Sequence, residues 1–191
     1  MDAKRSTAVL RRAEAVAAGM RMFADHGLTM TAMQRVADEI GVSQPYVFRL
    51  FGSKQEFFLA CLDELEGRVR EVFRQAAASS PDEPLPAMGE GFRHLVADGV
   101  ISGLWLQACA TARADEQVAE RCRSLVSGVL EESERLTGAA PNDLAQFLAD
   151  GALVMLLQAL RVDLSGGSRA AVASLHAAVA VDSSRVEGTV S

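Results

Sequence analysis

The segment GVSQPYVFRLFGSK, residues 41–54, places an arginine among aromatic side chains on one short predicted helix. Val47, Leu50 and Phe51 have the i, i+3, i+4 spacing that buries one stripe of a helix. Arg49 then points away from this stripe, toward solvent. An exposed guanidinium binds carboxylates and phosphates, and it can form two hydrogen bonds with O6 and N7 of guanine. The helix could therefore recognise an anion or a nucleic-acid base. The alternative is that Arg49 forms an ordinary surface ion pair.

The neighbours of Arg49 fit the same chemistry. Gln44 can bond to adenine or to a phosphate, Pro45 offers a flat apolar surface to a thymine methyl group, and Tyr46 can stack and also bind a phosphate. A solvated face is the usual environment of one arginine, but it explains Tyr46, Phe48 and Arg49 together less well. Burial of Phe48 against the first helix stays an open alternative.

Capping residues define the elements around this helix. Ser43 is placed to cap it, with Pro45 in the first turn, where a missing N–H costs no hydrogen bond. Thr31 and Gln34 form a capping box for the preceding helix, which Gly41 ends. Two short helices joined at a glycine are typical of a helix-turn-helix, although any helical hairpin needs similar residues.

The rest of the chain also reads as helical. The 191 residues are 49% hydrophobic, enough for a full core, and no alternating run of β-branched residues predicts a strand. We expect an all-α fold with a helix-turn-helix domain at 1–54 and a larger helical domain at 55–191. The expected helices are 7–26, 32–40, 44–51, 54–78, 87–98, 102–113, 116–136, 142–162 and 169–181.

Charge is distributed unevenly along the chain. The net charge is −6, yet residues 1–56 carry +2 and residues 57–191 carry −8, which suggests different partners for the two parts. The N-terminus lacks the apolar core of a signal peptide, and the most apolar stretch, residues 144–160, is too short to span a bilayer. These features predict a cytoplasmic protein with no membrane partner.

No residues are arranged for catalysis or metal binding. The cysteines Cys61, Cys109 and Cys122 are odd in number and irregularly spaced, which indicates free thiols rather than disulfides or a metal site. Three scattered histidines and no paired carboxylates argue against an enzyme. We expect no cofactor.

Several short motifs lie between residues 10 and 60. The first helix ends in Phe-Ala-x-x-Gly at residues 23–27, IGVS lies at the turn at 40–43, and F-R-x-F-G-S-K runs through 48–54. Together these motifs resemble the DNA-binding domain of the TetR family of transcriptional regulators. The remainder matches the family only in layout, apart from ARADEQV at 112–118, which is similar to a recurring junction between its sixth and seventh helices.

The resemblance implies a ligand-responsive repressor that binds a palindromic double-stranded DNA operator as a homodimer. Its third helix, residues 43–51, would enter the major groove. The expected DNA contacts are Thr31, Ser43, Gln44, Pro45, Tyr46, Phe48, Arg49 and Lys54. A basic arm offers further phosphate contacts through Lys4, Arg5, Arg11 and Arg12.

The resemblance further implies that helices four to seven surround a pocket for a small-molecule effector. The candidate ligand contacts are Met88, Phe92, Trp105, Cys109 and Met155, although such residues also fit a plain core. The last two helices carry more apolar surface than one small domain can hide, and the family pairs them with a second subunit. The candidate interface residues are Phe147, Val154, Val172, Leu175, His176 and Val179.

The sequence departs from the family at two positions. Many members carry tyrosine at the position of Phe48 and histidine or tyrosine at that of Leu50, and both are used to touch phosphate. Neither residue here can donate a hydrogen bond. A helical small-molecule-binding protein that has lost specific DNA binding is therefore the alternative function.

Overall fold

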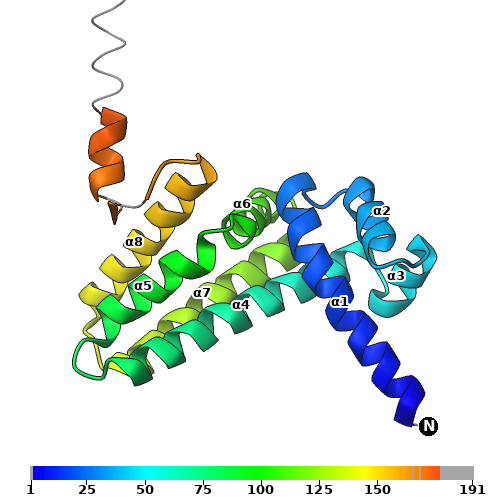
Figure 1. Cartoon of the computed structure of the whole chain (residues 1–191), viewed down its shortest axis with the longest axis horizontal. Helices are drawn as coiled ribbons and strands as arrows, with labels where there is room; N and C mark the ends of the chain where they lie inside the picture. Colours follow the sequence, from blue (N-terminus) through cyan, green and yellow to red (C-terminus); the bar gives the residue numbers. More distant parts are fainter. Residues whose placement is uncertain (1, 165, 168, 177–191) are drawn as a thin grey trace, which may run out of the picture.

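The computed structural model describes residues 2–164, 166–167 and 169–176, and all secondary structure among these residues is helical (Figure 1). The helices are α1 (Asp2–His26), α2 (Met30–Glu39), α3 (Gln44–Phe51), α4 (Lys54–Ser79), α5 (Pro84–Val96), α6 (Val100–Ala112), α7 (Glu116–Thr137) and α8 (Pro141–Ala159). A further helical segment occupies residues 169–176. The all-α prediction is confirmed.

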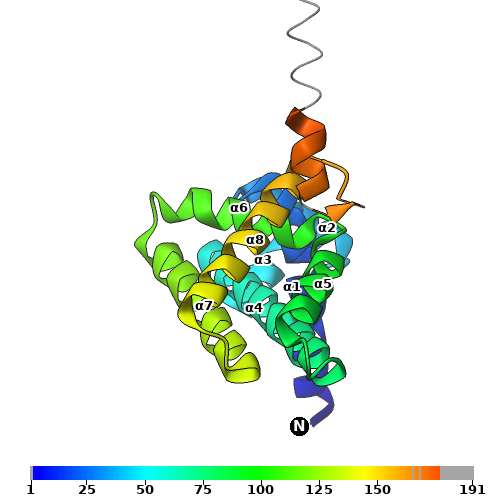
Figure 2. The same ribbon diagram turned by 90° about the vertical axis from the view of Figure 1, so that its left-hand side faces the viewer.

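The helices form a small head and a larger body. α1, α2 and α3 lie together at one end of the molecule, and α4 runs from this head into the body (Figure 1). With 26 residues, α4 is about 39 Å long. α4, α5, α7 and α8 make up the body, while α6 runs across them and meets α1 (Figure 2). The predicted domain boundary at residue 54 coincides with the first residue of α4.

Local capping rules explain several helix ends. Ser53 caps α4, since its Oγ accepts a hydrogen bond from the N–H of Glu56 at 3.0 Å. Asp115 caps α7 in the same way, at 3.1 Å from the N–H of Val118. Gly41 occupies the turn of the helix-turn-helix with φ +67°, a conformation that side chains other than glycine rarely adopt.

Four predicted helix starts, at residues 7, 32, 87 and 102, are wrong, since α1, α2, α5 and α6 begin two or more residues earlier. The N-cap of α2 is Thr29, whose Oγ1 accepts from the N–H of Ala32 at 3.2 Å, so the predicted capping box at Thr31 does not form. Gly27 turns the chain directly after α1 with φ +62°, and α2 begins correspondingly early. α5 begins at Pro84 instead of residue 87, because proline is compatible with the first turn of a helix.

One continuous hydrophobic core joins the head to the body. Phe57 of α4 lies at its centre and is fully buried. Its ring stacks on Phe51 of α3 at 4.0 Å and meets Phe23 of α1 edge-on at 5.1 Å. Gly19 permits this packing, since a β-carbon there would lie 2.5 Å from the Phe57 ring. α4 is therefore a structural part of the head as well as of the body.

Across the described residues, no single helix is long and apolar enough to cross a membrane. α5 and α6 would satisfy length and composition only as a pair, and they meet at an angle of 88°.

Candidate DNA-binding surface and ligand cavity

α3 has one buried and one outward side, as its sequence predicts. Val47 is fully buried and Phe51 nearly so, which fixes the helix against α1, α2 and α4. Pro45 and Arg49 are exposed on the opposite side, and Tyr46 is half-buried between the two sides. The outward side is thus held rigidly by the core while its polar tips stay accessible.

Arg49 is free to bind an external partner. Its guanidinium lies 4.9 Å from the centre of the Tyr46 ring, a cation–π arrangement, and it has no ion-pair partner within the described chain. Ser43 occupies the N-cap position but its side chain makes no cap hydrogen bond there, so the hydroxyl stays available beside the half-buried Gln44. These four side chains together present hydrogen-bond donors and acceptors along one helix.

Phe48 and Leu50 are half-buried and pack partly against the core. These two side chains, which have no hydrogen-bond donor, therefore help to pack α3 against the core. Only the exposed part of the Phe48 ring is available for the predicted DNA contact.

Thr31 and Lys54 lie at the edges of the head. Thr31 is exposed in the first turn of α2, where it does not cap the helix. The Nζ of Lys54 donates a hydrogen bond to the carbonyl oxygen of Leu28 at 2.6 Å, which leaves further N–H groups of the ammonium for a phosphate. Both remain predicted contacts.

Two arginines of α1 contact the ends of the helix-turn-helix. Arg12 donates to the carbonyl oxygen of Leu50 at 2.6 Å, and its guanidinium lies 4.2 Å above the ring of Phe51. Arg11 donates to the carbonyl oxygen of Ile40 at 3.3 Å. These carbonyls lie at the C-termini of α3 and α2, where a positive charge is stabilising. The two residues, predicted as phosphate contacts, thus hold the motif in place, while the side chains of Lys4 and Arg5 lie outside the described part.

Replacing Arg12 by alanine is expected to lower the free energy of unfolding by about 1 kcal/mol, through loss of the hydrogen bond and the cation–π contact. The salt dependence of DNA binding should stay unchanged, because Arg12 is engaged with Leu50 and Phe51. Lys54→Ala is the comparison: loss of a phosphate contact reduces the slope of log K against log salt concentration by about 1. A reduced slope for Arg12→Ala in fluorescence anisotropy would contradict the capping role.

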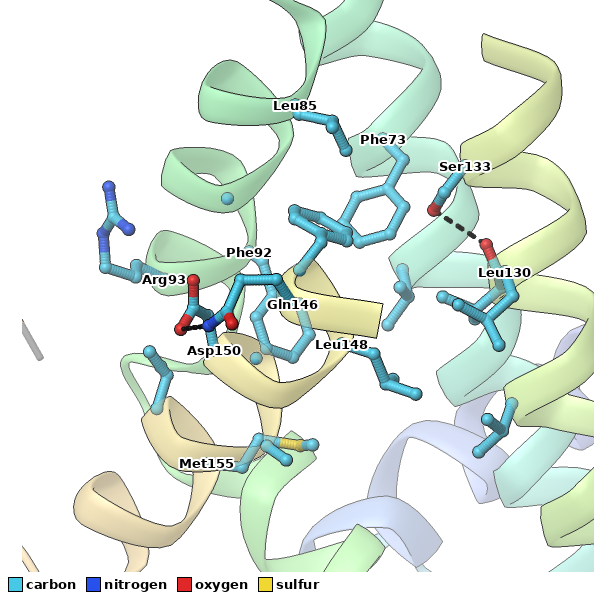
Figure 3. Close-up of a pocket in the computed structure, with 18 of the residues that line it drawn as sticks. Phe73, Leu85, Phe92, Arg93, Leu130, Ser133, Gln146, Leu148, Asp150 and Met155 are labelled. Carbon is cyan, nitrogen blue, oxygen red and sulfur yellow. Dashed lines mark hydrogen bonds between the residues drawn. The ribbon is translucent and has the colours of Figure 1, made fainter. Parts of the chain in front are cut away.

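A cavity of about 610 Å³ lies in the body, and residues of α4, α5, α6, α7 and α8 line it (Figure 3). Of the five predicted ligand contacts, Phe92, Trp105 and Met155 line it. Met88 is fully buried in the core and Cys109 is exposed, and neither is part of the lining. An apolar residue on the right helix can thus lie away from the void, and a ligand contact of Met88 or Cys109 stays a prediction that this cavity does not support.

The sequence did not identify several residues that line the cavity, of which the aromatic Phe73 is the most important. Phe73 lies 5.4 Å from Phe147 and 6.3 Å from Phe92, measured between ring centres. Leu65, Val69 and Phe73 recur every four residues along α4, a periodicity that indicates an inward side but not a void.

Polar side chains gather at one side of the cavity, between α5 and α8 (Figure 3). Gln146 donates to Asp150 at 2.9 Å, and Arg93 forms an ion pair with Glu90. The hydrogen bond from Arg93 lowers the pKa of the Glu90 carboxyl, so the pair is ionised at neutral pH. Deeper in, the buried Ser133 donates to the backbone carbonyl of Val129 at 2.8 Å.

The predicted interface residues are divided between the interior and the surface. Phe147 and Val154 line the cavity; Val154 is only 4% exposed and offers little surface to a second subunit, whereas Phe147 is half-buried. Val172 and Leu175 are 44% and 41% exposed, and His176 is exposed as well. The predicted residue Val179 lies outside the described residues.

The cysteines fit the prediction of free thiols. Cys61, Cys109 and Cys122 are unpaired, and burial raises the pKa of the Cys61 and Cys122 thiols above its ordinary value. Protonated thiols are poor nucleophiles and metal ligands. Within the described ranges no group of three or more His, Cys, Asp or Glu residues could hold a metal ion.

Comparison with known proteins agrees with this architecture. A family model described as bacterial regulatory proteins of the tetR family matches residues 15–61. The chain is 29% identical over 154 residues to the HTH-type transcriptional regulator BetI of Rhizobium meliloti strain 1021, covering 77% of this chain and 74% of that protein. It is 37% identical over 68 residues to the HTH-type transcriptional activator FasR of Mycolicibacterium smegmatis, which is 34% of this chain and 31% of that protein.

A solved structure from Mesorhizobium loti, described as a TetR-family transcriptional regulator, shares the fold with a TM-score of 0.64. It is 18% identical and covers 91% of this chain and 97% of its own.

A helix-turn-helix head on a larger helical body defines a DNA-binding regulator of transcription. The head, residues 15–61, matches the TetR family of bacterial regulatory proteins, and the chain is similar to the transcriptional regulator BetI over 77% of its length. Because the family and these relatives regulate transcription, the protein is a regulator and not an enzyme.

Proposed function

We propose that this regulator binds a palindromic operator as a homodimer through α3 and that a small molecule in the cavity releases it. The main support for this proposal is the outward side of α3. Arg49 has no ion-pair partner in the described chain, and the buried Val47 and Phe51 hold the helix against the core. In a major groove, Arg49, Gln44 and the other outward residues would meet base edges and phosphates. Such a regulator works in the cytoplasm, where chromosomal DNA is accessible.

Two helices connect the cavity with the head and support a response to a ligand. α4 contributes Phe73 to the cavity wall and Phe57 to the core of the head. α6 contributes Trp105 to the wall, and its Gly103 lies directly against α1: a β-carbon there would be 3.0 Å from the Cβ of Ala24. Because this contact cannot be compressed, a ligand that displaces α6 would also displace α1 and the motif it holds.

We propose repression as the direction of control. In the free dimer the two α3 helices would lie about 34–36 Å apart, the spacing of successive major grooves. The ligand would favour an arrangement in which their separation no longer matches this spacing. A reporter gene placed behind the operator should be expressed less when the protein is present. Higher expression in its presence would instead identify an activator.

The outer side of α8 supports dimer formation. It exposes small and apolar residues in helical register, Ala145, Ala149 and Leu156, and the exposed Leu160 follows directly after its last residue. Leu156 and Leu160 are 48% and 63% exposed, and Val172 and Leu175 of the next helical segment add to this apolar surface. A two-fold contact through it would supply the second α3 that a palindrome needs.

Replacing Leu156 by glutamate is expected to convert the dimer into a monomer, because the interface would have to bury a charge. Sedimentation velocity measures the change. Val9→Glu is the control, since Val9 is 63% exposed on α1, away from this surface, and its substitution should leave the dimer intact. A Leu156→Glu variant that stays dimeric would remove α8 from the interface.

Hydroxyl-radical footprinting on the DNA upstream of the gene tests the whole proposal. We expect two protected half-sites related by two-fold symmetry and one helical turn apart, about 34–36 Å. A single protected half-site, or uniform protection, would contradict a dimer that reads a palindrome.

The alternative is a helical small-molecule-binding protein without specific DNA binding. One observation favours it: Phe48 and Leu50 cannot donate a hydrogen bond to phosphate, and both pack partly against the core. The two functions differ in the footprint, since the alternative predicts ligand binding with no protected half-site.

A further inference from the structure

The deep wall of the cavity is apolar. Its most buried residues come from five helices, and each is at most 9% exposed. They include Leu65, Phe73, Phe92, Ile101, Leu125 and Val154. Such a surface gains free energy by covering apolar groups of a ligand, roughly 25 cal/mol for each Å² removed from water.

The deep wall offers little to an anion. Ser133 is the buried polar side chain among the described lining residues, and its hydroxyl hydrogen is already donated to the carbonyl oxygen of Val129. The indole N–H of Trp105 is a neutral donor on the half-buried part of the wall. A carboxylate or phosphate placed here would lose its hydration without gaining a cation, which is strongly unfavourable.

The polar side of the cavity does not favour an anion either. Arg93 is the cation among the lining residues, and Glu90 neutralises it in an ion pair. Asp143 and Asp150 of α8 also line the cavity, and Asp150 accepts a hydrogen bond from the neutral Gln146. Carboxylates therefore outnumber available cations where the end of a ligand would emerge.

We infer that the effector is a lipophilic molecule that carries no anionic group, with an apolar body in the deep cavity and any polar end, neutral or cationic, between α5 and α8. The inference rests on the proposed role of the cavity as effector site and adds the chemical class of the effector. Acyl carboxylates, phosphorylated metabolites and nucleotides are excluded by it.

Trp105 provides a direct measurement, because it is the single tryptophan of the chain and it lines the cavity. Three probes are built on a ten-carbon chain and differ at its end: decanol, decyltrimethylammonium and decanoate, in which the carboxylate supplies the tenth carbon. At a pH well above the pKa of a carboxylic acid, decanol and decyltrimethylammonium should change Trp105 fluorescence with dissociation constants about tenfold or more below that of decanoate. Equal or tighter binding of decanoate would overturn the inference.

Two matched variants identify the binding site. Gly151→Leu introduces a side chain into the lining, where a β-carbon would lie 3.6 Å from the Phe92 ring, and should weaken decanol binding about tenfold or more. Gly67→Leu makes the same change on the exposed side of α4, where a β-carbon meets nothing within 4 Å, and should leave binding unchanged. Equal affinity in both variants would place the probe outside the cavity and contradict the inference.

A DNA-binding measurement on the same preparation distinguishes the inferred ligand class from the proposed function as a regulator. Protein that shifts its operator but binds neither decanol nor decyltrimethylammonium would overturn the ligand class and leave the regulator intact. Protein that binds these probes at Trp105 but shifts no DNA would overturn the proposed function and leave the chemistry of the cavity intact.

Discussion

Replacing Phe57 by alanine is expected to lower the free energy of unfolding by about 3–5 kcal/mol. Phe57 is fully buried, stacks on Phe51 and meets Phe23 edge-on, so alanine would leave a void at the junction of α1, α3 and α4. Urea denaturation followed by circular dichroism measures the loss. The affinity for DNA should also decrease, because the Phe57 ring packs against the buried side of α3.

Leu156→Ala is the control for this prediction at low protein concentration, where the monomer is measured. Leu156 is 48% exposed, so its truncation should cost the monomer much less than truncation of Phe57. A loss below about 1 kcal/mol for Phe57→Ala would mean that the head does not depend on the shared aromatic core.

Replacing Arg49 by alanine is expected to weaken specific DNA binding by about 1–3 kcal/mol while unfolding stays nearly unchanged. Arg49 is exposed, and its contact in the free protein is with the ring of Tyr46. Arg49→Lys should recover little of the loss, because an ammonium cannot form the paired hydrogen bonds of a guanidinium with guanine. Anisotropy titration on operator and random duplexes measures both effects.

Arg68→Ala is the matched control for Arg49. Arg68 is an exposed arginine of α4 paired with Glu64, remote from α3, and its loss should leave operator affinity unchanged. If Arg49→Ala also bound the operator like the wild type, Arg49 would not be part of the DNA-binding surface.

Local features of the fold were predictable because they depend on a few neighbouring residues. The turn at Gly41 and the caps at Ser53 and Asp115 follow from side chains within three positions of the helix start or from a required positive φ. Thr29 and Thr31 are chemically equal N-cap candidates, and the choice between them depends on how the chain leaves α1. The path of the chain after α1 depends on tertiary packing, so the capping-box rule predicted Thr31 as the cap although Thr29 caps the helix.

The two sides of α3 were predictable for the same reason, since helical spacing alone separates Val47 and Phe51 from Pro45 and Arg49. The role of Arg12 was not predictable. Its partner carbonyl on Leu50 is 38 residues away along the chain, and only the packing of α1 on α3 brings them together.

The cavity could be predicted only in part. Phe92, Trp105 and Met155 were identified from residue type, yet Met88, one turn from Phe92 on α5, is buried in solid core. Whether an apolar side chain lines a void depends on what packs against it from other helices. The same uncertainty affected Phe147, whose apolar character suits an interface and a cavity wall equally well.

The most direct test of the central claim, that the outward side of α3 reads duplex DNA, is a salt-titrated binding measurement on DNA upstream of the gene and on a random duplex of equal length. We expect log K to fall steeply with log salt concentration for both duplexes, and operator binding to be tighter by about 10³-fold or more. Arg49→Ala should reduce this ratio. Equal affinity for the two duplexes, or no binding at low salt, would mean that α3 does not read duplex DNA.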